Sequence, residues 1–443
     1  MRNRTLAKTC LMPMPALLLF LMALAMPAWA AEPVGQHLGV ASCAGSTCHG
    51  ATSPVAGVNV QLNEYVTWVR QDKHAKAYEV LLSDQSKRIA RNLGIGEAHT
   101  AKICLDCHAD NPAEAMRGPT FQISEGIGCE GCHGGAQNWL SSHTAGPPHA
   151  NNVAKGMTAT EDPVTRATLC LSCHFGNQDK FVTHRMMGAG HPRMSFELDT
   201  FTQLQPAHFV VDEDYRKRKG FIPDAKLWAI GQAVTAHEHM TVLADSRRNR
   251  DGLFPEFVLF DCHSCHTPMS SKNWMPRNNG VRIPGMPHVN DSSLVMLQVL
   301  TNVLDPALGK AIAAKTRVLH GEGSKGMPQL SAAAGDLRDL TARMVTKFAG
   351  SPFDGKVIKA MIRGLVQAGL DGSYSDYADA EQAAMAIDTL VAGMRTEKAA
   401  SEKELQNLTK ALDAIFAATA KDEAYQPARF NAALTGVRAA LGG

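Results

Sequence analysis

The chain has 443 residues, of which 44 are Lys or Arg and 42 are Asp or Glu, so its formal charge of +2 is close to balance. A balanced charge gives no general attraction to nucleic acid, which excludes a protein that binds through a basic surface. Aromatic residues make up only 6% of the chain, whereas 18 histidines and 11 cysteines are present. Histidine and cysteine are the residues that most often bind metals or take part in redox chemistry, so these counts indicate a metal-binding or redox protein.

Residues 1–30 have the pattern of a secretory signal peptide. Basic residues among the first eight precede an apolar run at 17–26, and alanines at 28 and 30 fit an A-x-A cleavage site. The apolar run is short for a membrane span, and no second run of spanning length follows. We therefore expect a mature chain in the periplasm, without a transmembrane segment and without Cys10.

Every later cysteine belongs to a pair, and each pair is followed directly by histidine. C-x-x-C-H is the attachment signature of c-type haem, in which two thiols form thioethers to the porphyrin and the adjacent imidazole binds the iron. Four pairs have the two-residue spacer, and the first has four residues between its cysteines. The five sites are Cys43, Cys48 and His49; Cys104, Cys107 and His108; Cys129, Cys132 and His133; Cys170, Cys173 and His174; and Cys262, Cys265 and His266. The sequence therefore predicts five covalently bound haems.

Zinc knuckles and disulfides are the alternatives for these cysteines. Zinc would join the motifs two by two, would leave an odd one, and would not need a histidine after each pair. Disulfides across a two-residue spacer are strained and reducible, as in redox enzymes. For the first site, with its long spacer, a non-covalent haem or attachment through Cys48 alone is a further alternative.

The five motifs predict a mainly α, pentahaem cytochrome c domain at 31–290, in which short helices and long loops wrap around stacked haems. Periodic apolar residues predict helices at 59–70, 75–93 and 225–246. The stretch from 267 to 290 is rich in Pro, Gly and Asn, and is predicted to be a linker or a loop over the last haem.

Residues 291–443 contain no cysteine and are rich in Ala, Leu, Lys and Glu. Periodic runs predict an all-α helical bundle of about six helices, with a structural or docking role. The runs lie at 292–318, 334–349, 354–369, 378–396, 400–419 and 427–441.

The second axial ligand of each iron decides between an electron carrier and an enzyme, because two imidazoles close the iron to substrates. The five motifs leave 13 of the 18 histidines as candidates. Histidines soon after a motif, at a helix start or beside glycines that allow close approach to a porphyrin are favoured. These candidates are His74, His99, His143, His149, His184 and His191, with one of His143 and His149 expected to bind.

The other histidines are weaker candidates. His237 and His239 are two residues apart on a predicted helix, so their side chains point in different directions. His208 could bind a haem or cap a turn, and His263 lies inside a motif loop, where solvent or a propionate is the expected partner. We expect ordinary exposed side chains at His37, His288 and His320, and Met186 or Met187 is an alternative ligand.

The stretch from Cys43 through Trp68 and His74 to the motifs that end at His108 and His133 resembles the cytochrome c-554 family of multihaem electron carriers. The resemblance covers about 40–270. It implies haems in closely packed parallel and perpendicular pairs, mostly with two histidine ligands, and a distal ligand at His74. Members typically carry four haems, whereas this chain has five motifs, so the ligand pairing does not carry over directly.

These features predict a periplasmic electron-transfer protein without catalytic residues. Its expected partners are redox proteins, namely a quinol-linked donor, other cytochromes or a terminal reductase. The alternative is a multihaem enzyme with one open haem, such as a reductase of a small nitrogen or sulfur oxyanion or a hydroxylamine-type oxidoreductase. A third hypothesis assigns the docking of a partner complex to 291–443.

Overall fold

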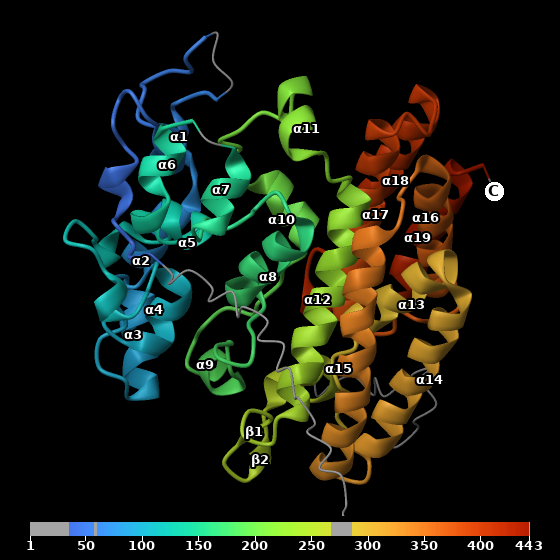
Figure 1. Cartoon of the computed structure of the whole chain (residues 1–443). Coiled ribbons are helices and arrows are strands. Elements are labelled where there is room, and N and C mark those ends of the chain that lie inside the picture. The colour runs from blue at the N-terminus through green and yellow to red at the C-terminus, as the bar shows by residue number, and fades with distance from the viewer. Residues whose placement is uncertain (1–34, 57–59, 147, 267–285, 443) are drawn as a thin grey trace, which may run out of the picture. The chain divides into compact units, whose positions relative to one another are not determined.

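The structure, a computed structural model, describes residues 35–56, 60–146, 148–266 and 286–442 (Figure 1). The predicted signal peptide at 1–30 and most of the turn-rich stretch at 267–290 lie outside these residues. Helices dominate the described part, which confirms the mainly α prediction. The sheet in this part is a small antiparallel hairpin of β1 (Arg250–Asp251) and β2 (Phe254–Pro255).

The helices before residue 220 are short, and local signals end them. The predicted helix at 75–93 is divided, because the Ser83 side chain accepts a hydrogen bond from the Ser86 amide and starts a new helix there. Gly94 then ends that helix in the left-handed conformation, at φ 69°. The short helices are α1 (Glu64–Gln71), α2 (Ala77–Val80), α3 (Asp84–Leu93), α4 (Lys102–His108), α5 (Cys129–His133), α6 (Leu140–Thr144), α7 (His149–Ala154), α8 (Pro163–His174), α9 (His184–Gly188), α10 (Leu198–Leu204) and α11 (Glu213–Lys219).

The long helix α12 (Asp224–Ala244) agrees with the predicted helix at 225–246. It is buried on almost all sides, which requires neighbours on more than one face. Those neighbours are α8, α10, α13, α15 and α17, and the packing against α15 is the most extensive. Figure 1 shows α12 lying along α15 and α17.

The C-terminal region forms seven helices in its described part. The predicted helix at 292–318 is two helices, because Asp305 accepts a hydrogen bond from the Leu308 amide and Pro306 opens the second helix. The other predicted runs each correspond to one helix. The helices are α13 (Ser292–Leu304), α14 (Pro306–Gly323), α15 (Met327–Gly350), α16 (Gly355–Leu370), α17 (Tyr377–Thr396), α18 (Glu402–Ala418) and α19 (Pro427–Ala440).

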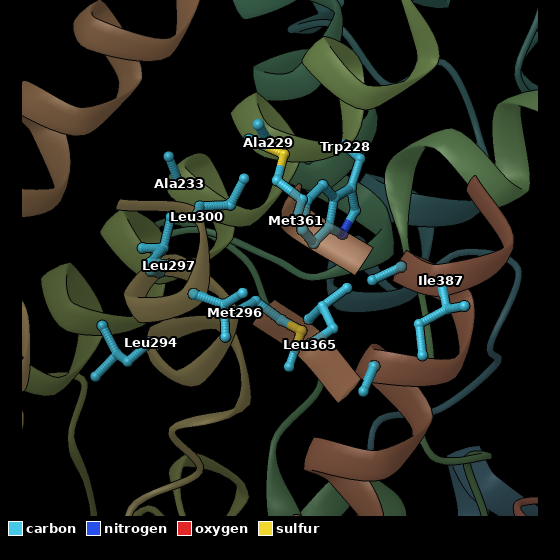
Figure 2. Packing of buried hydrophobic residues seen from close by; sticks show 14 of the residues in the cluster. Trp228, Ala229, Ala233, Leu294, Met296, Leu297, Leu300, Met361, Leu365 and Ile387 are labelled. Carbon is cyan, nitrogen blue, oxygen red and sulfur yellow. The ribbon is translucent and has the colours of Figure 1, made fainter. Parts of the chain in front are cut away.

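One hydrophobic core contains buried residues from both sides of residue 290. Figure 2 shows Trp228 of α12 together with Met296 of α13, Met361 of α16 and Ile387 of α17, all fully buried. Each such side chain contributes about 1.5–3 kcal/mol by its burial. The C-terminal helices thus stabilise α12. The docking role of 291–443 stays a prediction.

Candidate haem sites

Four of the five cysteine–histidine motifs lie on short helical turns. Three of them end at the C-terminus of α4, α5 and α8, and the fifth lies at the 3-10 helix η7 (Cys262–Ser264) and the residues after it. A separation of three residues on a helix places both sulfur atoms on one side, next to the histidine that follows. The ten cysteines of the motifs form no disulfides with one another in the described part of the chain.

The first motif reaches a related arrangement through a loop. Its four-residue spacer folds into consecutive turns, and the His49 amide donates to the Cys43 carbonyl at 3.2 Å. The Gly50 amide donates to the Gly45 carbonyl at 2.9 Å and closes the loop. The extra residues are thus accommodated beside the motif, while His49 is folded back towards Cys43.

Each of the five motif histidines has a second histidine ring opposite it. The distances between ring centroids lie between 5.8 and 6.4 Å in all five pairs. The pairs are His49 with His143 at 6.0 Å, His108 with His191 at 6.4 Å, His133 with His208 at 6.3 Å, His174 with His74 at 5.8 Å, and His266 with His184 at 6.2 Å. Ten of the 18 histidines are thereby used in pairs.

These distances fit one metal ion between two imidazoles. Two metal–nitrogen bonds of about 2 Å each, plus roughly 1 Å from each coordinating nitrogen to its ring centre, give about 6 Å between the centroids. Directly stacked aromatic rings would pack at a smaller spacing, as the rings of His174 and Phe196 do at 4.4 Å. The ring pairs therefore fit the iron of a haem with two histidine ligands.

Hydrogen bonds at Nδ1 orient several of the paired rings. Nδ1 of His49 lies 2.9 Å from Glu64, and Nδ1 of His74 lies 2.8 Å from Asp72. Nδ1 of His108 and of His191 donate to the backbone carbonyls of Ala77 and Pro192, at 3.1 and 2.8 Å. A metal-bound histidine usually donates its other N–H to a carboxylate or carbonyl, and this contact fixes its tautomer and orientation. Nε2 of these four rings is the atom that remains for a metal.

Burial keeps other paired rings in the neutral form that binds metals. It lowers the pKa of His133 to about 4, with a smaller contribution from His208, and it also lowers the pKa of His108 and His174. Asp72 is different, because burial raises its pKa while the stronger combined hydrogen bonds from His74 and Gln205 lower it to about 2. The Asp72 carboxylate is therefore charged where it meets the His74 ring.

Two predicted ligands lie elsewhere. His99 packs edge-on against the ring of Tyr78 at 6.3 Å, and His149 uses its Nε2 in a contact of 2.6 Å with Glu161. Since Nε2 of His149 is engaged in this contact, His143 is the ring that faces a motif histidine. His208, a weaker candidate by sequence, faces His133 instead. It lies far along the chain from its partner, and no local pattern marks it.

The remaining histidines have protein partners. His239 is buried, with Nε2 3.1 Å from the Leu259 carbonyl, and His237 contacts the Arg338 carbonyl through Nδ1 at 3.1 Å. The expectation of exposed side chains at His37, His288 and His320 is wrong. The His37 side chain is 13% exposed and binds Asp110 at 2.7 Å, and His320 is 5% exposed and binds Asp291 at 2.8 Å. His288 is half-buried, with its ring 5.9 Å from that of His320. Met186, an alternative ligand by sequence, is buried, and Met187 lines a pocket beside the fifth motif.

Different motifs also lie close together. The Cys173 sulfur lies 3.8 Å from the carbonyl of Asp106 in the second motif. Glu130 of the third motif accepts hydrogen bonds from the amides of Leu38 and Gly39, just before the first motif. The first motif therefore adjoins the third, and the second adjoins the fourth.

Residues 42–134 match the family profile described as cytochrome c554 and c-prime. In this region the chain resembles cytochrome c554. The matched residues include the first three motifs, His49, His108 and His133 among them. No curated protein and no solved structure matches the chain.

The resemblance to cytochrome c554 and the motif geometry support a multihaem c-type cytochrome with covalently bound haem. In the part of the chain that the structure describes, the helices lack the combination of length and apolar character needed to cross a membrane.

Proposed function

We propose that this protein transfers electrons through five covalently bound haems, each held between two histidines. The observation that supports this proposal is the set of five ring pairs at spacings of 5.8–6.4 Å. The proposed distal ligands are His143, His191, His208, His74 and His184, opposite the motif histidines in chain order. Haem iron with two imidazole ligands exchanges one electron and has no open position for a substrate.

The residues of the chain supply position and electrostatics for this function. Each cysteine pair would anchor a porphyrin edge, and each histidine pair would hold the iron from the two faces of the porphyrin. The adjacency of the second and fourth motifs would bring two haem edges together, and that of the first and third motifs would do the same for another two. Close edges favour fast electron transfer between neighbouring sites.

The proposed location is the periplasm, to which the pattern at 1–30 would direct the chain. Haem attachment outside the cytoplasm agrees with this location. The proposed partners are redox proteins, such as a quinol-linked donor, another cytochrome or a terminal reductase. A membrane-bound partner is compatible with a carrier that receives electrons at an exposed haem edge.

Two measurements on the purified, exported protein test the proposal. Intact mass spectrometry should show the polypeptide mass plus five haems, and a smaller number would reject the full set of sites. Electron paramagnetic resonance of the oxidised protein should show low-spin ferric signals alone. A stoichiometric high-spin haem that binds nitrite, hydroxylamine or cyanide would instead support the multihaem enzyme.

A further inference from the structure

A pocket beside the fifth motif is built from distant parts of the chain. Cys262 and His263 of the motif line it, together with residues from α12 and from beyond residue 290. Apolar side chains such as Phe181 and Val258 form much of its wall. An apolar pocket that borders a haem-attachment cysteine is suited to a porphyrin.

The C-terminal region contributes to this pocket. Tyr377 and Ala378 at the start of α17, and Asp422 at the 3-10 helix η8 (Asp422–Ala424), are among its lining residues. The ring of Tyr377 lies 6.2 Å from the ring of His263, in an edge-to-face contact. Residues beyond 290 are thereby in direct contact with the last haem motif.

Arg193 connects the two sides of the pocket. Its guanidinium contacts both carboxylate oxygens of Glu381, at 2.7 and 3.1 Å, and lies 3.7 Å from Asp422. It also lies over the Tyr377 ring, 5.2 Å from the centroid. The Tyr377 hydroxyl is 3.0 Å from Glu381 and 3.0 Å from the Thr419 carbonyl. A two-point arginine–carboxylate contact fixes direction as well as distance.

The charges of this cluster reach the fifth motif. Arg193 and Asp422 both line the pocket that Cys262 borders, and their charged groups lie 3.7 Å apart. A charged group that lines the pocket changes the energy of a charge on a haem bound there. Arg193 would favour the reduced state, whose net charge is lower, and Glu381 would oppose this effect.

We propose that Arg193, Tyr377 and Asp422 form a wall of the fifth haem site, that Glu381 holds Arg193 and Tyr377 in place behind it, and that these groups set the reduction potential of the haem. This inference rests on the proposed function, because it requires a haem at Cys262 and Cys265. It gives the C-terminal region a specific role, which is to complete a haem pocket by means of α17 and η8. Without the charged contact to Arg193, this wall would lose its fixed position.

Two neutral substitutions make opposite changes and so test the role of charge. Arg193→Gln removes the positive group, so the potential of the fifth haem should fall. Glu381→Gln leaves Arg193 less compensated, so the same potential should rise. A severalfold change in the reduction equilibrium of this haem is expected in each case, since these charges act in a partly buried site. Arg193→Lys keeps the charge and should retain most of the wild-type value.

The control is Glu404→Gln, which breaks a similar ion pair with Lys359 at 2.8 Å, between α18 and α16. Its side chain is 20% exposed, close to the 16% of Glu381, but its partner Lys359 does not line the pocket, whereas Arg193, the partner of Glu381, does. It should leave all haem potentials unchanged. Spectroelectrochemical titration gives the potentials, circular dichroism confirms folding, and a variant with Cys262→Ala and Cys265→Ala identifies the contribution of the fifth haem by difference.

The possible outcomes are distinct. The proposed wall would be supported if the reduction potential of the fifth haem shifts in opposite directions in Arg193→Gln and Glu381→Gln while the other potentials stay unchanged. It would also be supported if a folded variant loses this haem alone. Five haems with unchanged potentials in Arg193→Gln and Glu381→Gln would overturn it and leave electron transfer intact. Absence of haem from the wild-type protein would instead reject the proposed function itself.

Discussion

Replacement of Asp72 by asparagine tests the electrostatic control of the proposed distal ligand His74. The Asp72 carboxylate is 7% exposed and accepts hydrogen bonds from Nδ1 and the amide of His74, at 2.8 and 2.9 Å, and from Gln205 at 2.9 Å. An anion at this place stabilises the oxidised, more positive iron. Asp72→Asn should therefore raise the potential of the haem held by His74 and His174.

The size of this rise follows from the geometry. The Asp72 oxygen lies 2.8 Å from Nδ1 of His74, and a metal at Nε2 would be about 7 Å away, given a metal–nitrogen bond of about 2 Å. Two unit charges about 7 Å apart at an effective dielectric constant of about 20 interact by about 2.4 kcal/mol. This equals about 100 mV, because a tenfold change in a one-electron equilibrium is about 59 mV. Since the His74 side chain is 34% exposed, solvent screening reduces the expected rise to about 50–100 mV.

Spectroelectrochemical titration would measure this change as the displacement of one haem out of five. The control is Asp354→Asn, because Asp354 caps α16 through the amides of Lys356 and Val357, and asparagine caps a helix equally well. It should displace no haem potential. An unchanged titration of Asp72→Asn, or an equal displacement in both variants, would refute the assigned role of Asp72.

The remaining predictions concern ligation and stability. His208→Ala should convert one haem to a high-spin form in electron paramagnetic resonance, whereas His149→Ala should leave the low-spin signals unchanged; the reverse result would exchange their roles. Leu297→Ala should lower the free energy of unfolding in urea by about 2–5 kcal/mol, because Leu297 is fully buried in the shared core; a loss below about 1 kcal/mol would contradict that packing. Burial, with smaller contributions from Glu197 and Asp224, raises the pKa of Asp199 to about 8. The folded state then holds a proton that the unfolded state releases, so stability should fall as the pH rises from about 4 to about 8. Asp199→Asn should remove this fall in urea titrations, and an unaltered pH dependence would disprove it.

Local chemistry made the motif histidines predictable from sequence. A thiol pair and the histidine that follows are adjacent in the chain, so their spacing alone indicates the haem signature. His74 also has a local signal, because Asp72 caps the turn that contains it and binds its ring. Helices such as α12 and α16 were predictable for a similar reason, since their periodicity or flanking residues lie within one segment.

The pairing of distal histidines depends on contacts between remote segments. His149 and His208 each lie a few residues after a short helix, α6 and α10 respectively, and the adjacent sequence does not show which of them faces a motif histidine. In the structure Glu161 engages Nε2 of His149, while His208 reaches His133 from beyond α10. The helices that pack against α12 were also not predictable from the sequence. A helix that is apolar on most faces is expected to be buried, but its sequence does not show which elements cover it.

The packing of α12 against α15 has a consequence for the chain while it is being synthesised. Translation proceeds from the N-terminus at about 5–20 residues per second, so α12 is complete several seconds before the last turn of α15 exists. During that interval Trp228 and its apolar neighbours lack the surface that later encloses them. The nascent polypeptide therefore presents this largely buried, apolar helix to proteases and chaperones at least until residue 350 has been added.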